Sequence, residues 1–284
     1  MENLDRGIIM NYEKAFETNP FKTSYALTGR DEEAKEILYR INSGSMLLIE
    51  AKDGFGKTAL LKYAIDNFRG KGKVIYVDAN KLNKRLDIAN LLKKKPKGMI
   101  LLMDNVHYLS KKNNEKIKYN YDEDRIKAVV FTTTSYSLVN FSDAIRDRIG
   151  KNIIRLKRHD CRHVLEIISQ RTGNSVILPD DVIKEIYYDS DNLRQILIKC
   201  RILCRYAKEN GREIVDIKDI SKIKFREEEQ EEQTDICAEC REKLIKVREH
   251  WRCRKCDNYC KNCGALADRD DDSCPECGAK VKGE

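Results

Sequence analysis

The stretch Ala51-Lys52-Asp53-Gly54-Phe55-Gly56-Lys57-Thr58 decides how this 284-residue chain folds. It joins a short apolar run at 46–49, typical of a buried strand, to a run at about 57–68 with helical periodicity. In such a loop, backbone N–H groups and the positive end of the helix dipole point at phosphate oxygens. Glycines let the backbone approach the anion, Lys57 reaches its terminal phosphates and the Thr58 hydroxyl binds Mg²⁺. We therefore expect ATP and Mg²⁺ to bind here, with nucleotide contacts from Ala51, Asp53, Gly54, Phe55, Gly56, Lys57, Thr58 and Ala59.

A second strand-like run supplies an acidic partner for this loop. Residues 100–103 are all apolar, and Asp104 follows them directly. A carboxylate at the end of such a strand holds Mg²⁺ through water. We therefore assign Asp104 to the same magnesium ion as Thr58.

Eight of the eleven cysteines form four Cys-x₂-Cys pairs near the C-terminal end. Each pair makes a tight turn that offers two thiolates, and two turns complete a tetrahedral site. Pairing the turns in sequence predicts two structural Zn²⁺ ions. The short spacer between Cys256 and Cys260 leaves an interleaved pairing open, and disulfides are the main alternative to metal. The predicted ligands are Cys237, Cys240, Cys253 and Cys256 for one ion, and Cys260, Cys263, Cys274 and Cys277 for the other.

The order of these and weaker motifs resembles the AAA+ superfamily of P-loop ATPases over about residues 16–225. Residues 19–21 and 27–33 resemble the box that binds adenine in archaeal origin-recognition initiators and clamp loaders. Ala51 is the usual alternative to glycine at the first position of the family's phosphate loop. The C-terminal cysteines resemble the double zinc-ribbon family.

The same resemblance implies roles for three further residues. Thr134, after the fourth predicted strand, matches the sensor-1 position. Arg148 matches the arginine finger that one subunit offers to its neighbour, with Arg146 as the alternative finger. Arg194 matches the sensor-2 residue of the lid, which reaches the γ-phosphate.

One departure from the family pattern affects mechanism. AAA+ enzymes usually follow the strand-end aspartate with a glutamate that orients the attacking water, whereas this chain has Asn105. An amide can position water through its oxygen but cannot accept a proton as a base. We therefore predict ATP binding with slow hydrolysis, accelerated when a neighbour contributes Arg148. Asp122, Glu123 or Asp124 could substitute as the acid, although nothing in their spacing places them at the site.

Strand-like and helical patterns alternate up to about residue 158 and are helical beyond it. Alternation predicts a parallel sheet covered by helices on both faces. The fold class is therefore α/β: a P-loop NTPase core, a small α-helical lid and two small β zinc ribbons. The polar run at 110–125 predicts an exposed loop or a solvated helix. The expected strands are 46–49, 73–78, 99–103, 128–132 and 152–156, and the expected helices are about 31–42, 57–68, 85–93, 160–171, 180–188, 191–209 and 216–222. The expected domains are the core at 1–158, the lid at 159–225, an acidic linker at 226–234 and the zinc module at 235–284.

The charge distribution favours a polyanionic partner. The chain has 55 basic and 47 acidic residues, and the basic excess lies within residues 1–225. Such a surface suits nucleic acid, although an ordinary Lys-rich solvated surface explains it equally well. No apolar run reaches the roughly 18–20 residues that span a bilayer, and the N-terminal residues lack a signal-peptide pattern. We therefore expect a soluble, cytoplasmic protein with no membrane partner.

Two functional hypotheses follow from these features. The first is an ATP-controlled assembly factor in replication, recombination or transposition, which binds DNA, assembles with itself or another AAA+ protein, and docks a protein partner through its zinc ribbons. The second is a signalling or scaffold switch whose ribbons bind protein and which does not bind nucleic acid. Salt-dependent binding of DNA in the presence of ATP distinguishes the two hypotheses.

Overall fold

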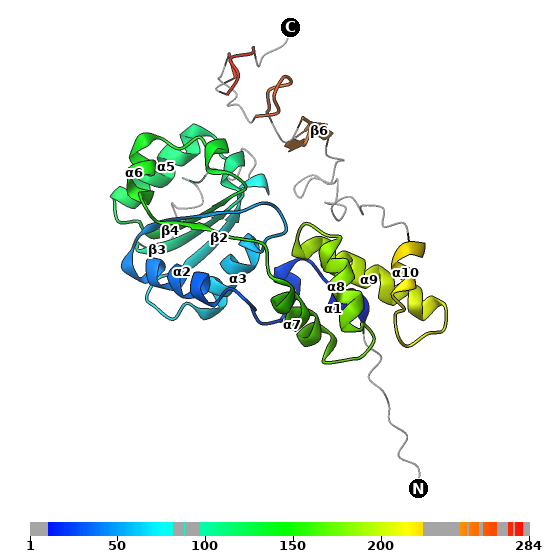
Figure 1. Cartoon of the computed structure of the whole chain (residues 1–284). Coiled ribbons are helices and arrows are strands. Elements are labelled where there is room, and N and C mark those ends of the chain that lie inside the picture. The colour runs from blue at the N-terminus through cyan, green and yellow to red at the C-terminus, as the bar shows by residue number, and fades with distance from the viewer. Residues whose placement is uncertain are drawn as a thin grey trace. The chain divides into compact units, whose positions relative to one another are not determined.

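The computed structural model describes residues 11–81, 88, 97–223, 245–248, 250–255, 258–265, 272–274 and 276–280. Within the described residues up to 223, the chain forms two compact units. A helical unit takes in residues 11–31, 53–62 and 157–223, and a sheet unit takes in residues 32–52 and 63–156. Figure 1 shows the elements of each.

The sheet unit is built on five parallel strands in the order β2-β3-β4-β1-β5. The strands are β1 (Met46–Glu50), β2 (Val74–Asp78), β3 (Met99–Asp104), β4 (Ile126–Thr133) and β5 (Ile153–Arg155). Parallel neighbours require long crossover connections, and those at 51–73, 105–125 and 134–152 each contain a helix. The predicted α/β class, a parallel sheet flanked by helices, is confirmed.

Helices cover the sheet on both faces. They are α2 (Asp31–Ser43), α3 (Lys57–Asn67), α5 (Lys111–Asp122) and α6 (Asp143–Ile149), with 3-10 turns η2 (Ala79–Lys81), η3 (Val106–Tyr108) and η4 (Tyr136–Leu138). On one face, Leu101 and Val129 share a buried cluster with Ile117 of α5 and Ile145 of α6. Figure 1 shows α2 on the opposite side of the sheet from these two helices. Because both faces are covered, every residue of β3 is buried.

The helical unit packs around one long helix. Its elements are α1 (Tyr12–Ala15), η1 (Pro20–Lys22), α7 (Cys161–Thr172), α8 (Asp180–Tyr188), α9 (Leu193–Glu209) and α10 (Lys218–Lys222). The buried residues of α9 recur at helical spacing, from Ile196 to Ala207, and pack against α7, α8 and the fully buried Phe16 after α1. The start of α9 falls two residues later than predicted, because Asn192 Oδ1 accepts a hydrogen bond from Gln195 N at 3.0 Å and caps the helix.

The described residues also answer a question that the sequence left open. The polar run at 110–125 contains helix α5, which is not fully solvated, because Asn114, Ile117 and Asn120 form a buried stripe. Apart from the buried Ile88, the helix expected at 85–93 lies outside the described residues, as does the acidic linker at 226–234. The expected domain limits remain a prediction.

Among the residues that the structure describes, no helix is both long and apolar enough to cross a membrane.

A glycine contact at the amino edge of the sheet generates a stability prediction. Gly72 has φ +122°, and a Cβ there would lie 2.6 Å from the carbonyl oxygen of Gly98. Gly72→Ala should therefore lower the free energy of unfolding by about 1–3 kcal/mol for backbone strain, plus the cost of the clash. Gly211→Ala is the control, because Gly211 also has positive φ but no atom within 4 Å of its Cβ position. Urea titration that gave both variants the same midpoint would contradict the prediction.

Candidate functional site

The phosphate loop leaves β1 at the carboxyl edge of the sheet. The N–H of Ala51 donates to the carbonyl oxygen of Thr133 at 3.1 Å, which continues the β1–β4 pairing by one residue. Gly54 and Gly56 then take φ of +76° and +94°, where a side chain would be strained. The N–H of Leu60 donates to the carbonyl oxygen of Gly56 at 3.1 Å. Helix α3 therefore begins at Lys57. The local structure is thus a strand, a glycine loop and a helix N-terminus, as predicted.

Lys57 is buried although it carries a charge. Its side chain is 5% exposed, and Nζ lies 3.3 Å from Oδ1 of Asp53, whose side chain is 71% exposed. Because Asp53 is well solvated, this ion pair stabilises the loop only weakly. Lys57 is therefore held within the loop beside the carboxylate of Asp53.

Gly54 lies directly against the start of α9. A Cβ on Gly54 would lie 2.4 Å from Oδ1 of Asn192, the residue that caps α9. Arg194 is the second residue of that helix and is exposed. Within the helical unit, Gly54 therefore lies beside the cap of the helix that carries Arg194.

The predicted adenine box also contacts this loop. Arg30 is buried and donates to the carbonyl oxygens of Lys157 and, at 3.5 Å, Phe55. Gly29 packs against the ring of His163, since a Cβ there would lie 2.7 Å from the ring carbon Cγ. Burial, with the nearby charges of Arg30 and His163, lowers the pKa of His159 to about 4. His159 is therefore neutral at physiological pH, a feature that no sequence pattern indicated.

Asp104 is buried at the end of β3 and receives two hydroxyl donors. Thr132 Oγ1 donates to one carboxylate oxygen, and Tyr76 OH donates to the other at 3.0 Å. Burial raises the pKa of Tyr76, and the charge of Asp104 raises it further, so the phenol stays protonated and remains a donor. Sequence reasoning missed both hydroxyls. Thr134, the predicted sensor-1 residue, lies half-buried one residue beyond β4, and its role stays a prediction.

Asn105 follows Asp104 with a left-handed backbone, φ 58° and ψ 44°. Its N–H donates to Thr132 Oγ1 at 3.1 Å, and its Nδ2 donates to Asp78 Oδ1 at 3.1 Å. Asparagine is one of the few residues that adopt this backbone readily.

The acids considered as substitutes for the missing glutamate lie at the wrong end of the sheet. The carbonyl oxygen of Asp124 accepts from Gly98 N at 3.2 Å, just before β3 begins. Five strand steps at about 3.3 Å each put that edge about 17 Å from Asp104. Asp122 and Glu123, at the end of α5, precede Asp124 directly. The three acids are therefore excluded from the Asp104 site.

Both candidate finger arginines are held within their own chain. Arg148 forms a two-pronged pair with Asp122, with Nε to Oδ1 and NH2 to Oδ2 both at 2.9 Å, and donates to the carbonyl oxygen of Ala144 at 2.7 Å. The guanidinium carbon Cζ of Arg146 lies 4.9 Å from the centre of the Tyr136 ring. The same guanidinium donates to the carbonyl oxygens of Phe141 and Val139, both at 3.2 Å. The finger role of Arg148 stays a prediction, and Asp122 is its partner in the isolated chain.

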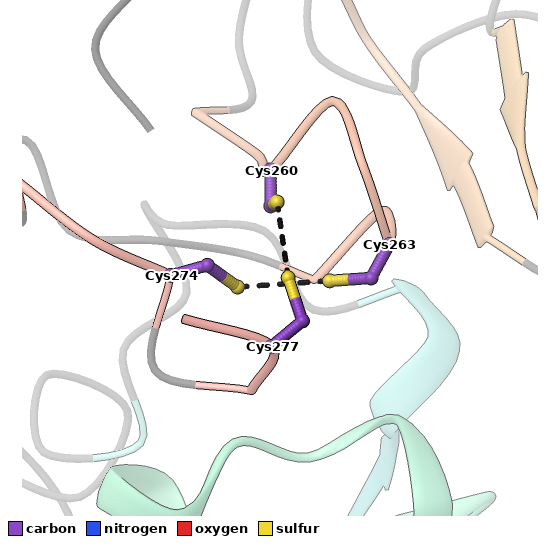
Figure 2. Close-up of side chains that lie close together, drawn as sticks. All are labelled: Cys260, Cys263, Cys274 and Cys277. Carbon is purple, nitrogen blue, oxygen red and sulfur yellow. Dashed lines mark hydrogen bonds between the residues drawn. The ribbon is translucent and has the colours of Figure 1, made fainter. Parts of the chain in front are cut away.

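Four cysteines near the C-terminal end form a compact cluster (Figure 2). The Sγ atoms of Cys260, Cys263, Cys274 and Cys277 all lie within 4.8 Å of one another. The separations Cys260–Cys277 and Cys263–Cys274 are both 3.6 Å. Zn–S bonds of about 2.3 Å in a tetrahedron give S···S distances of about 3.8 Å, so the thiols fit zinc. They are too far apart for disulfides, whose sulfurs lie about 2.05 Å apart.

The backbone repeats one turn twice around this cluster. Cys260 N donates to Ala265 O at 2.8 Å and Gly264 N donates to Cys260 O at 2.8 Å. The second turn repeats the pattern, with Cys274 N to Ala279 O at 2.7 Å and Gly278 N to Cys274 O at 2.9 Å. Both glycines have positive φ, 79° and 71°. The cluster thus supports the predicted pairing of the third Cys-x₂-Cys turn with the fourth.

The thiols of the cluster have unequal acidities. Donation from Ala279 N–H and from the Asn262 side chain lowers the pKa of Cys277 to about 6, whereas burial raises that of Cys263 to about 12. Zinc must therefore displace protons to bind all four sulfurs, and its affinity falls at low pH.

The other predicted zinc group is only partly described. Cys237, Cys240 and Cys256 lie outside the described residues. Cys253 is buried, and it directly follows a hairpin of β6 (Ile245–Val247) and β7 (His250–Arg252). The segment between the first two Cys-x₂-Cys turns therefore contains a hairpin, while the zinc site there stays a prediction.

Comparison with known proteins places the fold. No protein-family model and no curated protein sequence matches the chain. The Aeropyrum pernix ORC1 protein, solved in complex with DNA, matches with a TM-score of 0.61 and 15% identity, over 74% of this chain and 68% of its own. Cdc6p from Pyrobaculum aerophilum matches with a TM-score of 0.58 and 15% identity, over 72% and 68%. The Thermotoga maritima RuvB Holliday junction branch migration motor matches with a TM-score of 0.56 and 19% identity, over 69% and 68%. The chain thus has the P-loop NTPase fold of these structures.

The cysteine cluster generates a metal-binding prediction. Cys274→Ser should lower the zinc content of the full-length protein by about one ion per chain, because it removes one of four ligands from a tetrahedral site. Cys161→Ser is the matched control, since Cys161 begins α7, outside the cluster. Zinc measured by mass spectrometry after dialysis checks this. Equal zinc content in the two variants would contradict it.

Proposed function

We propose that this chain is an AAA+ ATPase that binds ATP with Mg²⁺ at residues 51–59. The observation that carries the proposal is the convergence of polar strand ends in one parallel sheet. β1 and β3 flank β4 in parallel register, so the phosphate loop leaves the sheet at the same edge as the buried Asp104. A glycine loop with a buried lysine and a strand-end carboxylate is the donor set that MgATP requires.

Each residue near the loop then has a proposed role. Lys57 exchanges its weak pair with Asp53 for the β- and γ-phosphates, and Thr58 and Asp104 hold the magnesium ion, which neutralises phosphate charge when bound. Arg194 reaches the γ-phosphate from the first turn of α9, supported by the contact of Gly54 with Asn192. The segment of Gly29 and Arg30 binds the adenine, supported by the bond of Arg30 to Phe55 in the loop.

Hydrolysis is proposed to be slow in the isolated chain. Asn105 offers no carboxylate at the usual position, and Arg148 is engaged by Asp122. A neighbouring subunit's nucleotide must draw Arg148 away from Asp122 before it can act as a finger. Fingers supplied in this way raise turnover by roughly 10³–10⁵ in other NTPases. Hydrolysis would therefore depend on assembly into an oligomer, either with itself or with another AAA+ protein.

A nucleic-acid process is the best supported setting. The basic excess within residues 1–225 suits a polyanion. One structure with the same fold was solved in complex with DNA, and another is described as a Holliday junction branch migration motor. We therefore propose an ATP-controlled assembly factor in replication, recombination or transposition, with the zinc ribbons as the docking module for a protein partner. Two zinc ions per chain are part of this proposal.

Lys57→Ala tests nucleotide binding. The variant should bind MgATP roughly 100-fold more weakly, because it loses about two charge-assisted contacts to phosphate. Lys35→Ala, which removes an exposed lysine of α2, should bind as the parent does. Calorimetric titration of the folded, zinc-loaded proteins gives both dissociation constants. Undiminished affinity in Lys57→Ala, or no affinity in the parent, would refute the proposal.

The nucleic-acid role makes a separate prediction. With ATP present, the full-length protein should bind DNA with an affinity that falls steeply as salt rises, because binding releases counterions from the phosphates. Light scattering during size-exclusion chromatography, with and without ATP and then with DNA, measures assembly and DNA binding together. Assembly that ignores both DNA and salt would favour the alternative, a scaffold or signalling switch whose ribbons bind protein.

A further inference from the structure

Arg252 joins the β6–β7 hairpin to the turn that begins the cysteine cluster. Its side chain is 4% exposed, and its Nε donates to the carbonyl oxygen of Gly264 at 2.6 Å. Gly264 belongs to the third Cys-x₂-Cys turn, because its own N–H donates to the carbonyl oxygen of Cys260. A buried cation costs free energy unless its donors find acceptors. The bond to Gly264 therefore anchors the end of β7 on this turn.

A second bond joins the other end of the hairpin to the same turn. Arg248 directly follows β6, where the chain reverses into β7, and its guanidinium donates to Oδ1 of Asn262 at 3.4 Å. Asn262 lies within the third turn, between Cys260 and Cys263. Two bonds from opposite ends of the hairpin thus hold it along one turn. The hairpin and the third turn therefore form one body.

Exposed cations gather on this body. The side chains described between residues 245 and 261 include no acid. The whole segment 237–263 has eight basic and four acidic residues, whereas 264–284 has three basic and six acidic residues. The positive charge of the zinc module therefore lies with the hairpin and the first three turns. The exposed cations described there are Lys246, Arg248, Arg254, Lys255 and Lys261.

The chemistry of this surface fits phosphate better than it fits a protein partner. Among the side chains that the structure describes in the zinc module, no large hydrophobic one is exposed. Protein interfaces have an apolar or aromatic centre, whereas interfaces with nucleic acid are more polar and more positive. Proteins that bind single strands add exposed aromatic rings on which bases stack. Cations without such rings suit the backbone of a duplex.

We propose that residues 245–261 form a contact surface for the phosphate backbone of duplex DNA, and that Arg252 is the positioning residue that holds its two halves together. The inference rests on the nucleic-acid role proposed above, and it adds a DNA contact to a module that was proposed there to dock protein. Contacts of lysine and arginine with the backbone carry no base information, so this binding is independent of sequence. It also requires no ATP hydrolysis.

Fluorescence anisotropy with labelled duplex DNA of about 30 base pairs tests the surface at several salt concentrations. The full-length, zinc-loaded protein is used with ATP present. The double variant Arg254→Gln with Lys261→Gln removes one exposed cation from each half. It should bind roughly 10–100-fold more weakly at about 0.1 M salt. Each lost phosphate contact removes about 0.9 from the slope of log affinity against log salt, so the slope should fall in magnitude by about 1.8.

The matched control makes the same change of net charge elsewhere. Lys35→Gln with Lys184→Gln removes two exposed lysines, one from α2 and one from α8. This control should keep the affinity and the salt slope of the parent. The zinc content of both double variants, measured by mass spectrometry, should equal that of the parent, because no cysteine is changed.

Arg252→Gln tests whether the two halves act together. Arg252 is buried, so it contacts no phosphate itself. Glutamine lacks the guanidinium that donates to Gly264, so the hairpin is no longer anchored on the third turn. The exposed cations all remain, but they no longer keep one arrangement. We expect DNA binding to weaken roughly 3–10-fold, less than in the double variant of the surface, with the zinc content unchanged.

The possible failures are distinguishable. If the surface variant binds DNA as tightly as the matched control, the DNA contact lies outside residues 245–261 and the inference is wrong. If polyglutamate of matched charge displaces the DNA as well as unlabelled duplex does, the surface fits an acidic protein and not phosphate. Parent affinity in Arg252→Gln, or loss of zinc from it, would overturn the positioning role of Arg252. A parent with no affinity for DNA would instead refute the proposed nucleic-acid role itself.

Discussion

The parallel register of β2, β3, β4 and β1 is the constraint on which the rest of this structure depends. It places the carboxyl ends of the strands at one edge, where polar groups from different strands meet. Tyr76 and Thr132 donate to Asp104 from the strands on either side of it, and Asn105 reaches Asp78 across the β2–β3 pair. A slip of one residue between β2 and β3, or between β3 and β4, would turn the side chains of the shifted strand to the opposite face and remove the bonds across that pair.

The parts of the site that sequence could predict are those encoded locally. Loop 51–58 has a fixed spacing between an apolar run and a periodic run, and Asp104 directly follows four apolar residues. Sequence could not indicate that Thr132 contacts Asp104, because that contact depends on the register of β4 against β3. The pair of Arg148 with Asp122 was hidden for a similar reason: the two residues come from helices α5 and α6, which are separated by strand β4.

The zinc module shows the same division between local and long-range information. Each Cys-x₂-Cys turn is encoded by its own spacing, and in the third and fourth turns the glycine that follows, Gly264 or Gly278, has a positive φ. Which two turns share an ion depends on how the intervening segment folds back. For the third and fourth turns, matching backbone hydrogen bonds and sulfur separations of 3.6 Å supply that information.

The close approach of Gly54 to Asn192 has a thermodynamic consequence for the helical unit. The side chain of Asn192, which caps α9, lies directly against Gly54 of the phosphate loop. A small shift of Gly54 would therefore move the start of this 17-residue helix without any residue in between. The other face of α9 forms the core of that unit, so the shift cannot be absorbed locally. By linkage, if a macromolecule that displaces α9 alters the affinity of the loop for the proposed phosphate ligand, that ligand alters the affinity for the macromolecule by the same factor.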